Sequence, residues 1–227
     1  FLEAIRQIGH EVGPQNCLFI HVVLVPYLYA SGEHKSKPAQ HSVKELMNTG
    51  IFPDIIVMRS DEPIEESIKE KISLFCNVKR ECVIENKTVP VLYEAPLMLH
   101  QEGLDEVAVK ILGLPDRPID LSEWSEMIDR IHSSDRKVTI AMVGKYMELH
   151  DAYLSVMEAL KHASWQEGAT VNIKWVDSET VTKDSEEEIF SDVDGILVPG
   201  GYGYRGVEGK IEAVRWARVN NIPFLGI

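Results

Sequence analysis

A glycine-rich segment after a short apolar run is the clearest candidate for chemistry in this sequence. Residues 194–198 (DGILV) predict a strand, and four glycines follow closely, at Gly200, Gly201, Gly203 and Gly206. Glycine lets backbone N–H groups approach a ligand without a side chain in the way, and oxyanion holes are built in this manner. The segment therefore predicts a loop that stabilises negative charge. The alternative interpretation is an ordinary glycine-rich turn.

This loop differs from the two common phosphate-binding motifs. Lys210 is not followed by Ser or Thr, so the segment is not a P-loop. Gly201, Gly203 and Gly206 have the spacing of a dinucleotide-binding fingerprint, but no ribose-binding acid follows at the right distance. We expect Arg205 and Glu208 to supply polar contacts from a mobile flap.

A second candidate is residues 34–40 (HKSKPAQ), within the polar loop 31–40 and just before a predicted helix. The free N–H groups and the dipole at a helix N-terminus favour an anion, and the Lys35 and Lys37 ammonium groups suit a polyphosphate. Gln40 can both donate and accept hydrogen bonds, as recognition of a base or a ribose requires. The alternative interpretation is a solvated basic loop.

Lys71 is the third candidate, because of its position on a predicted helix that starts near Ile64. At 100° per residue it shares an apolar stripe with Ile68, Ile72 and Phe75. A lysine on a buried face needs a partner or a route to water, and a bound phosphate or base would serve. A side chain that reaches the solvent from the edge of the core is the alternative.

The composition limits the classes of protein to which the chain can belong. It has 227 residues, a formal net charge of −13, 44% hydrophobic and 26% charged residues, which is ordinary for one large or two small globular domains. The acidic excess argues against nucleic-acid binding, and the apolar runs are too short for a membrane helix. We expect neither nucleic acid nor a membrane as a partner.

Three cysteines are too few and too irregularly spaced for a disulfide framework or a CxxC metal site. They are Cys17, Cys76 and Cys82, and we expect all three to be structural. This cysteine content fits a reducing cytoplasm.

The elements that must position these candidates alternate between strands and helices. Strands are predicted at 17–25, 53–60, 81–84, 138–143, 170–176, 194–198 and 222–227. Helices are predicted at 2–12, 41–50, from 61 onward, 121–132, 151–163 and 210–220. The alternation predicts an α/β protein with open, mainly parallel sheets. The nearly continuous apolar run 17–25 predicts a strand covered on both faces.

The prolines and aspartates of residues 113–120 mark a change of pattern, which resumes after Lys137. We therefore expect a first domain at 1–114, an interdomain linker with a helix at 115–136, and a second domain at 137–227.

Several of these segments resemble one enzyme family, over essentially the whole chain and in order. VGKYMELHDAYLSVMEALKHA, PGGYGYRGVEGK and PFLGI resemble the start of the class I glutamine amidotransferase domain of CTP synthases. GEHKSKPAQHSVKEL, SDEPI and LFCNV resemble the end of the amidoligase domain of that family, which is of the P-loop type. Tyr202 stands where the family usually has Phe.

The resemblance implies a ligase of pyrimidine biosynthesis that makes CTP from UTP, ATP and glutamine. ATP with Mg²⁺ phosphorylates the uracil 4-oxygen, and ammonia released from glutamine displaces the phosphate. The resemblance also implies feedback binding of CTP, activation by GTP, a homotetramer with nucleotide sites at subunit contacts, and a cytoplasmic location.

Site residues follow from the resemblance at matching positions. For UTP and CTP they are Lys35, Ser36, Lys37, Pro38, Ala39, Gln40 and Lys71; for ATP they are Lys87, Thr88 and Val89. Gly200 and Gly201 would form part of the oxyanion hole, with Gly201 also binding glutamine. Arg205, Gly206 and Glu208 match a flap implicated in GTP activation.

The resemblance also predicts that the sequence is an internal fragment. The P-loop and magnesium-binding acids of the family would lie before Phe1, and the nucleophilic cysteine would follow Ile227. We therefore expect no metal site and no independent activity in these residues. Two alternatives remain: another amidoligase with a glutaminase domain, such as a cobyric acid synthase, and a non-catalytic nucleotide-sensing or assembly module.

Overall fold

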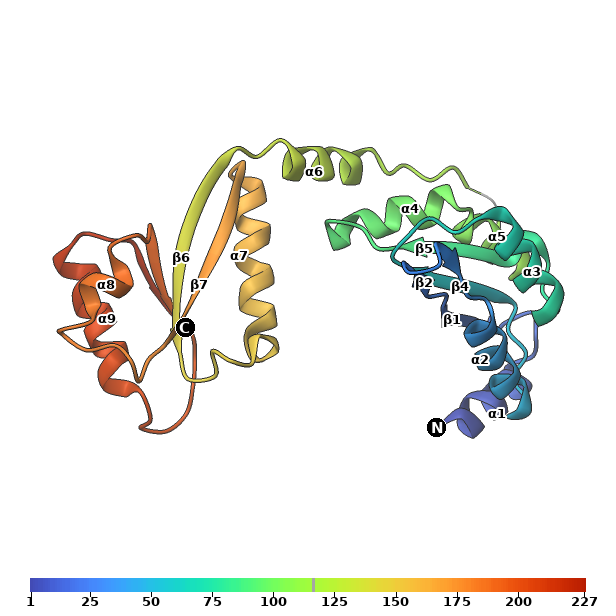
Figure 1. The fold of residues 1–227 in the computed structure, drawn as a ribbon, viewed down its shortest axis with the longest axis horizontal. Coiled ribbons are helices and arrows are strands. Elements are labelled where there is room, and N and C mark those ends of the chain that lie inside the picture. The colour runs from blue at the N-terminus through green and yellow to red at the C-terminus, as the bar shows by residue number, and fades with distance from the viewer. Residues whose placement is uncertain (116) are drawn as a thin grey trace. The chain divides into compact units, whose positions relative to one another are not determined.

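The structure is a computed structural model that describes residues 1–115 and 117–227. It forms two compact units, Phe1–Leu121 and Ser122–Ile227, and each unit contains its own parallel sheet (Figure 1). The open, parallel α/β architecture expected from the sequence is confirmed.

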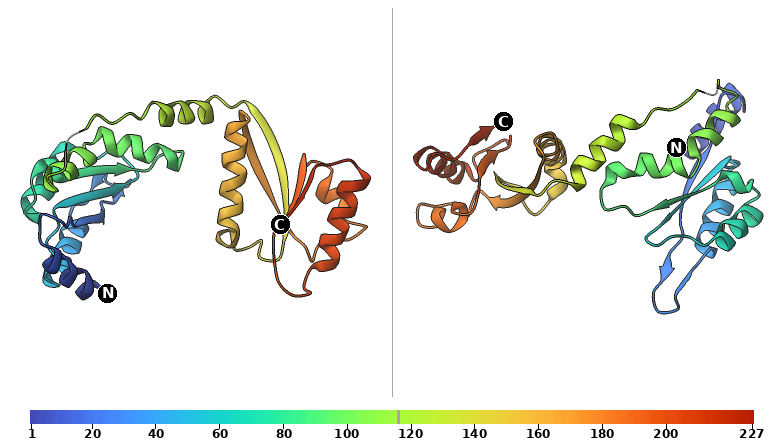
Figure 2. Two further views of the ribbon diagram at one scale, coloured as in Figure 1. Left: turned by 180° about the vertical axis from the view of Figure 1, so that it is seen from behind. Right: turned by 90° about the horizontal axis from the view of Figure 1, so that it is seen from above.

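The first unit is built on a three-stranded parallel sheet in the order β1-β4-β5. Its strands are β1 (Ile20–Leu24), β4 (Ile55–Ser60) and β5 (Val83–Lys87). A short antiparallel hairpin of β2 (Tyr27–Leu28) and β3 (Glu33–His34) projects from the sheet (Figure 2). The helices are α1 (Leu2–Val12), α2 (Lys37–Asn48), α3 (Glu66–Cys76), α4 (Ala95–Gln101) and α5 (Leu104–Ile111), with 3-10 turns at Arg80–Cys82 and Leu92–Glu94.

The central strand β4 is buried on both faces. One face carries Ile56 and Met58, which pack with residues of α2 and α3. The opposite face carries Ile55 and Val57, which pack with residues of β5 and α5. The alternating side chains of one strand therefore support two hydrophobic layers, as a central parallel strand requires.

Strand β1 differs from the prediction that it is covered on both faces. It is an edge strand, and Ile20, Val22 and Leu24 are exposed on one side. Among the described residues, α4 and α5 pack over β4 and β5 and leave this part of β1 uncovered. The apolar run correctly predicted a strand, but a run of this kind does not identify the neighbours of the strand.

Two helices of the first unit begin at residues other than those predicted. Helix α2 starts at Lys37 rather than near residue 41, with Pro38 in its first turn, where the fixed φ of proline fits a helix. Ser42 therefore lies inside the helix rather than at its N-terminus. Helix α3 starts at Glu66, after an extended Glu65, rather than near residue 61.

The second unit is built on a four-stranded parallel sheet in the order β7-β6-β8-β9. Its strands are β6 (Arg136–Gly144), β7 (Ala169–Asp177), β8 (Gly195–Val198) and β9 (Phe224–Gly226). Its helices are α6 (Ser122–His132), α7 (Leu154–Gln166), α8 (Glu186–Phe190) and α9 (Val207–Val219), with a 3-10 turn at His150–Tyr153.

Helices cover both faces of this sheet, with α7 on one side and α8 and α9 on the other (Figure 1). Met142 and Leu197 form a core with Tyr153, which directly precedes α7. On the opposite face, Phe190 and Trp216 pack with the apolar residues of β6 and β8. This arrangement fixes the carboxyl ends of β6 and β8 beside each other.

The three cysteines are free thiols, and Cys76 and Cys82 are buried. Burial raises the pKa of both buried thiols, so they are poor nucleophiles at neutral pH. Among residues 1–115 and 117–227, no helix combines the length and apolarity that a membrane span needs.

Candidate functional site

The glycine-rich loop lies at the carboxyl end of β8, beside the end of β9. Ile227 N donates a hydrogen bond to Val198 O at 3.0 Å. A Cβ atom placed on Gly200 would lie 3.7 Å from the Ile227 carbonyl oxygen. Ligands of open α/β sheets bind outside the carboxyl ends of the strands, so the loop occupies the edge where a site is expected.

The side chain of Lys145 binds this loop through hydrogen bonds. Lys145 was not predicted as a site residue from the sequence. It directly follows β6 and is only 5% exposed. Its ammonium group donates hydrogen bonds to the carbonyl oxygens of Tyr202 and Gly203, the latter at 2.8 Å. A lysine directly after a buried strand was the only available signal, and that pattern is equally typical of a solvated loop.

Arg205 fastens the other end of the loop. Its Nη2 donates to Lys145 O at 3.0 Å, and its Nη1 lies 3.1 Å from Glu179 Oε1. The guanidinium carbon is 5.4 Å from the centre of the Tyr146 ring, within the range of a cation–π contact. The Lys145 side chain thus donates to main-chain carbonyls of the loop, and the Arg205 side chain donates to the main-chain carbonyl of Lys145.

A second lysine approaches the loop from α9. Lys210 Nζ would lie 3.5 Å from a Cβ on Gly201, and it donates to Pro199 O at 3.4 Å. Burial lowers the pKa of Lys210, and the positive charge of Lys145 lowers it further. Within the described part of the chain, neither lysine forms an ion pair with a carboxylate, so the loop has excess positive charge.

The loop enters α9 through two glycines that cannot be enlarged. Gly206 has a φ of +69°, and a Cβ there would lie 2.0 Å from Ser178 Oγ. A Cβ on Gly209 would lie 1.7 Å from Ser178 O. Glu208, between them, is exposed in the first turn of α9. Helix α9 is therefore seated directly on the turn that follows β7.

In the first unit, Lys35 and Ser36 precede α2, and Lys37–Gln40 form its first turn. Ser36 is buried and accepts a hydrogen bond from Gln40 Nε2 at 3.1 Å, and Ala39 is fully buried. Lys37 and Pro38 are exposed. Ser36 and Ala39 therefore anchor the polar segment, while Lys37 and Pro38 are open to solvent.

His34 anchors the segment from within the predicted polar loop, so this part of the loop is not solvated. Its side chain is fully buried, with Nδ1 2.7 Å from Glu65 Oε2 and Nε2 3.1 Å from Ser60 Oγ. The backbone N–H of Glu65 and the contact with His34 together lower the pKa of the Glu65 carboxyl. His34 thus joins the residue before Lys35 to the connection between β4 and α3.

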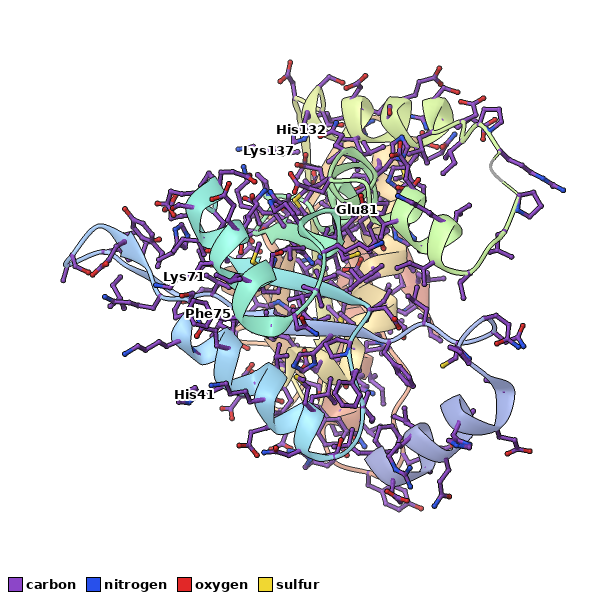
Figure 3. The ribbon with its side chains drawn as sticks, turned by 90° about the vertical axis from the view of Figure 1, so that its right-hand side faces the viewer. His41, Lys71, Phe75, Glu81, His132 and Lys137 are labelled. Atoms are coloured by element: carbon purple, nitrogen blue, oxygen red, sulfur yellow. The ribbon has the colours of Figure 1, made fainter. Side chains whose placement is uncertain are left out.

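The prediction that Lys71 lies on a buried stripe is wrong. Lys71 is exposed, Phe75 is 56% exposed, and both project from one side of α3 (Figure 3). The buried line of α3 runs through Lys69, Ile72 and Cys76 instead. Lys69 and Lys71 lie on adjacent stripes of the helix, and helical spacing alone does not indicate which of the two stripes is buried.

Lys69 is buried because two carboxylates neutralise it. Its Nζ lies 2.7 Å from Glu85 Oε2 and 3.1 Å from Glu102 Oε2. Burial lowers the pKa of Lys69, but the hydrogen bonds to Glu85 and Glu102 outweigh that effect, so the pKa is raised overall.

Lys87 is the last residue of β5, and Thr88 and Val89 follow it at the same carboxyl edge as the Lys35 segment. Thr88 Oγ1 donates to Asp61 Oδ1 at 2.7 Å, and Thr88 N donates to Ser60 O at 2.9 Å. Because His34 also contacts Ser60, the end of β4 connects the two predicted nucleotide segments. Lys71, in the second turn of α3, forms no hydrogen bond or ion pair with either segment among the described residues.

A magnesium ion was expected in the intact protein but not in these residues. Among the described residues, no group of three or more His, Cys, Asp or Glu side chains could hold a metal ion.

Comparison with known sequences identifies the two units. A sequence model described as CTP synthase N-terminus matches residues 1–114, and one described as glutamine amidotransferase class-I matches residues 148–227. The chain belongs to the CTP synthase family. The two matches lie in different structural units.

Curated CTP synthases align with every residue of the chain. The CTP synthase of Clostridium kluyveri is 59% identical over 227 residues, and that of Clostridium acetobutylicum is 57% identical. The chain spans 42% of the length of each of these CTP synthases. A solved structure described as the Trypanosoma brucei CTPS glutaminase domain with bound acivicin is 42% identical over 39% of this chain and 35% of that chain, with a TM-score of 0.37.

Proposed function

We propose that the intact protein is a CTP synthase that aminates UTP in an ATP-dependent reaction, with ammonia taken from glutamine. Membership of the family supports this assignment. The observation that carries it is the position of Gly200 and Gly201, at the end of β8 and beside the end of β9, with two lysines around them. An excess of positive charge at free backbone N–H groups suits an intermediate with a negative oxygen.

The first unit would bind the nucleotides. Lys35–Gln40, at the start of α2, would bind the phosphates and base of UTP or of the inhibitor CTP, and Lys87–Val89 would contact ATP. Both segments are tied to Ser60 at one sheet edge, which supports a shared site. Lys71 is exposed, and this fits a nucleotide site completed at a contact between subunits of a homotetramer.

The second unit would bind glutamine. We propose that Gly201 contacts glutamine and that the N–H groups of Gly200 and Gly201 stabilise the oxyanion of a covalent intermediate. The three cysteines of the described chain all belong to the first unit. The resemblance to the family implies that a nucleophilic cysteine follows β9 in the intact protein. Arg205, Gly206 and Glu208 would form the flap through which GTP acts.

A split between two ammonia sources tests this proposal. In the intact protein, Gly201→Val should lower glutamine-driven CTP synthesis by about 10²- to 10³-fold, as expected when one oxyanion donor is lost. Synthesis driven by added ammonium chloride should stay within about twofold, because the nucleotide unit is unchanged. Tyr202→Phe, which alters a fully exposed ring in the same loop, is the matched control. An equal fall in both reactions would contradict the role of Gly201.

A further inference from the structure

We infer that Lys145 is a positioning residue for glutamine hydrolysis, and that its ammonium group holds the glycine loop in its working conformation. This inference rests on the proposed function, because the loop matters only if glutamine is hydrolysed there. Lys145 directly follows β6, and it acts on the loop through the carbonyl groups of Tyr202 and Gly203.

The burial of Lys145 needs an explanation that packing does not provide. A buried ammonium group is costly unless it is paired and hydrogen-bonded. Lys69 in the first unit shows the usual solution, with two carboxylates around it. Lys145 has instead two main-chain carbonyls, both from the loop, and no ion pair within the described residues. The charge is thus held in place by the loop, and the loop by the charge.

The loop has little else to fix its conformation. Tyr202 and Tyr204 are 101% and 97% exposed, so neither ring anchors it by packing. Gly203 has a φ of +82°, a conformation that L side chains rarely adopt. Arg205 closes the loop at its far side with its bond to the Lys145 carbonyl. Both ends of the segment between Gly201 and Arg205 are therefore bound to the same residue, Lys145.

Lys145 starts from a rigid base. Strand β6 is paired with β7 over its whole length and with β8 near its end. Gly144, the last residue of β6, accepts a hydrogen bond from Ser178 N at 2.8 Å. The position of a loop bound to Lys145 is therefore fixed relative to the sheet. The methylene groups of Lys145 also lie 3.9 Å from a Cβ placed on Gly201. Displacement of the ammonium group would therefore be felt at the proposed oxyanion donor.

Lys145→Met in the intact protein tests the inference, because methionine keeps the aliphatic stem and removes the charge and the donors. Lys183→Met, at an exposed lysine of the same unit, is the matched control. We expect kcat for glutamine hydrolysis to fall at least about 10-fold with a smaller change in KM, since misplaced oxyanion donors act in the transition state. Ammonia-driven CTP synthesis should stay within about twofold of the wild type.

Hydrogen exchange supplies a second measurement that does not depend on activity. Exchange of the peptide that covers residues 200–206 should become faster in Lys145→Met, while exchange of β6 and β7 stays as in the wild type. If the wild-type protein does not hydrolyse glutamine, the proposed function fails, and the exchange result alone decides whether Lys145 holds the loop.

Three results would overturn the inference. The first is unchanged exchange of residues 200–206 in Lys145→Met. The second is faster exchange there with glutamine hydrolysis retained, because the loop would then need no tether. The third is faster exchange throughout β6 and β7, which would make Lys145 a residue required for folding of the unit.

Discussion

The backbone carbonyl of Lys145 accepts a hydrogen bond from Arg205 Nη2 at 3.0 Å, while the Lys145 ammonium group donates to Gly203 O at 2.8 Å. The same lysine is thus acceptor and donor for two parts of one loop. Arg205 is also paired with Glu179. The proposed GTP flap and the proposed oxyanion loop therefore share one set of contacts.

Arg205→Met should weaken activation by GTP. The variant loses the bond to Lys145 O and the pair with Glu179, so the flap is no longer joined to the base of the loop. We expect the stimulation of glutamine hydrolysis by GTP to fall by about tenfold, which corresponds to about 1.4 kcal/mol. Initial rates measured over a GTP titration check this. Stimulation equal to that of the wild type would show that these contacts do not transmit the effect.

His34→Leu should weaken UTP binding without affecting glutamine hydrolysis. The substitution removes the contacts with Glu65 and Ser60 that fix the residue before Lys35. We expect KM for UTP to rise by roughly tenfold, since each lost hydrogen bond is worth about 1 kcal/mol. His10→Leu, at an exposed histidine of α1, is the control. An unchanged KM for UTP would mean that the loop is held by its other contacts alone.

Lys69→Met should destabilise the first unit selectively. It leaves the Glu85 and Glu102 carboxylates without their shared partner, and removal of one member of a buried ion pair costs about 3–5 kcal/mol. The four tryptophans of the chain all lie in the second unit, at Trp124, Trp165, Trp175 and Trp216. In a protein of residues 1–227, circular dichroism should therefore detect earlier unfolding while the tryptophan fluorescence transition stays in place.

The Lys69 contribution should also depend on pH in one direction. Its pKa is raised in the folded state, so the stabilisation is complete below the unfolded pKa of about 10.4 and is lost as pH rises through the folded value. The stability difference between wild type and Lys69→Met should thus be constant near neutral pH and shrink only in strong alkali. A difference that shrinks between pH 6 and 8 would contradict this assignment.

Gly209→Ala should destabilise the second unit. The new methyl group would lie 1.7 Å from Ser178 O, a main-chain atom that cannot turn aside. We expect a loss of about 1–3 kcal/mol or more, as for other overpacked sites. Tryptophan fluorescence during urea unfolding measures the change, with Arg218→Ala on the same helix as control. A variant as stable as Arg218→Ala would show that α9 can shift on the Ser178 turn.

The buried strands were the most predictable part of the fold. The apolar runs of β4, β6 and β8 predicted strands, and their alternation with helices predicted parallel sheets. Helices α4 and α5 were not predicted, nor was the hairpin of β2 and β3. Pro96 in the first turn of α4 and the shortness of these elements hid the periodic signal.

The candidate site was predictable where glycines and lysines cluster in the sequence. It was less predictable where a side chain contacts a residue that is distant in the sequence. The glycine loop and the Lys35 segment both lie at carboxyl ends of strands. The tether of Lys145 joins residues 58 positions apart, and His34 contacts Glu65 across 31 positions. Tertiary packing creates those pairs, so local pattern carries no trace of them. Lys71 shows the opposite error, because helical spacing suggested burial where Lys69 holds the buried position.

The most direct test of the account follows nitrogen from glutamine into the nucleotide. The intact protein is incubated with UTP, ATP, Mg²⁺ and glutamine labelled with ¹⁵N at the side-chain amide, and the products are analysed by mass spectrometry. The account predicts CTP that carries the label at its 4-amino group, with unlabelled ammonium chloride able to replace glutamine. If UTP is recovered unchanged with either nitrogen source, the protein is not a CTP synthase.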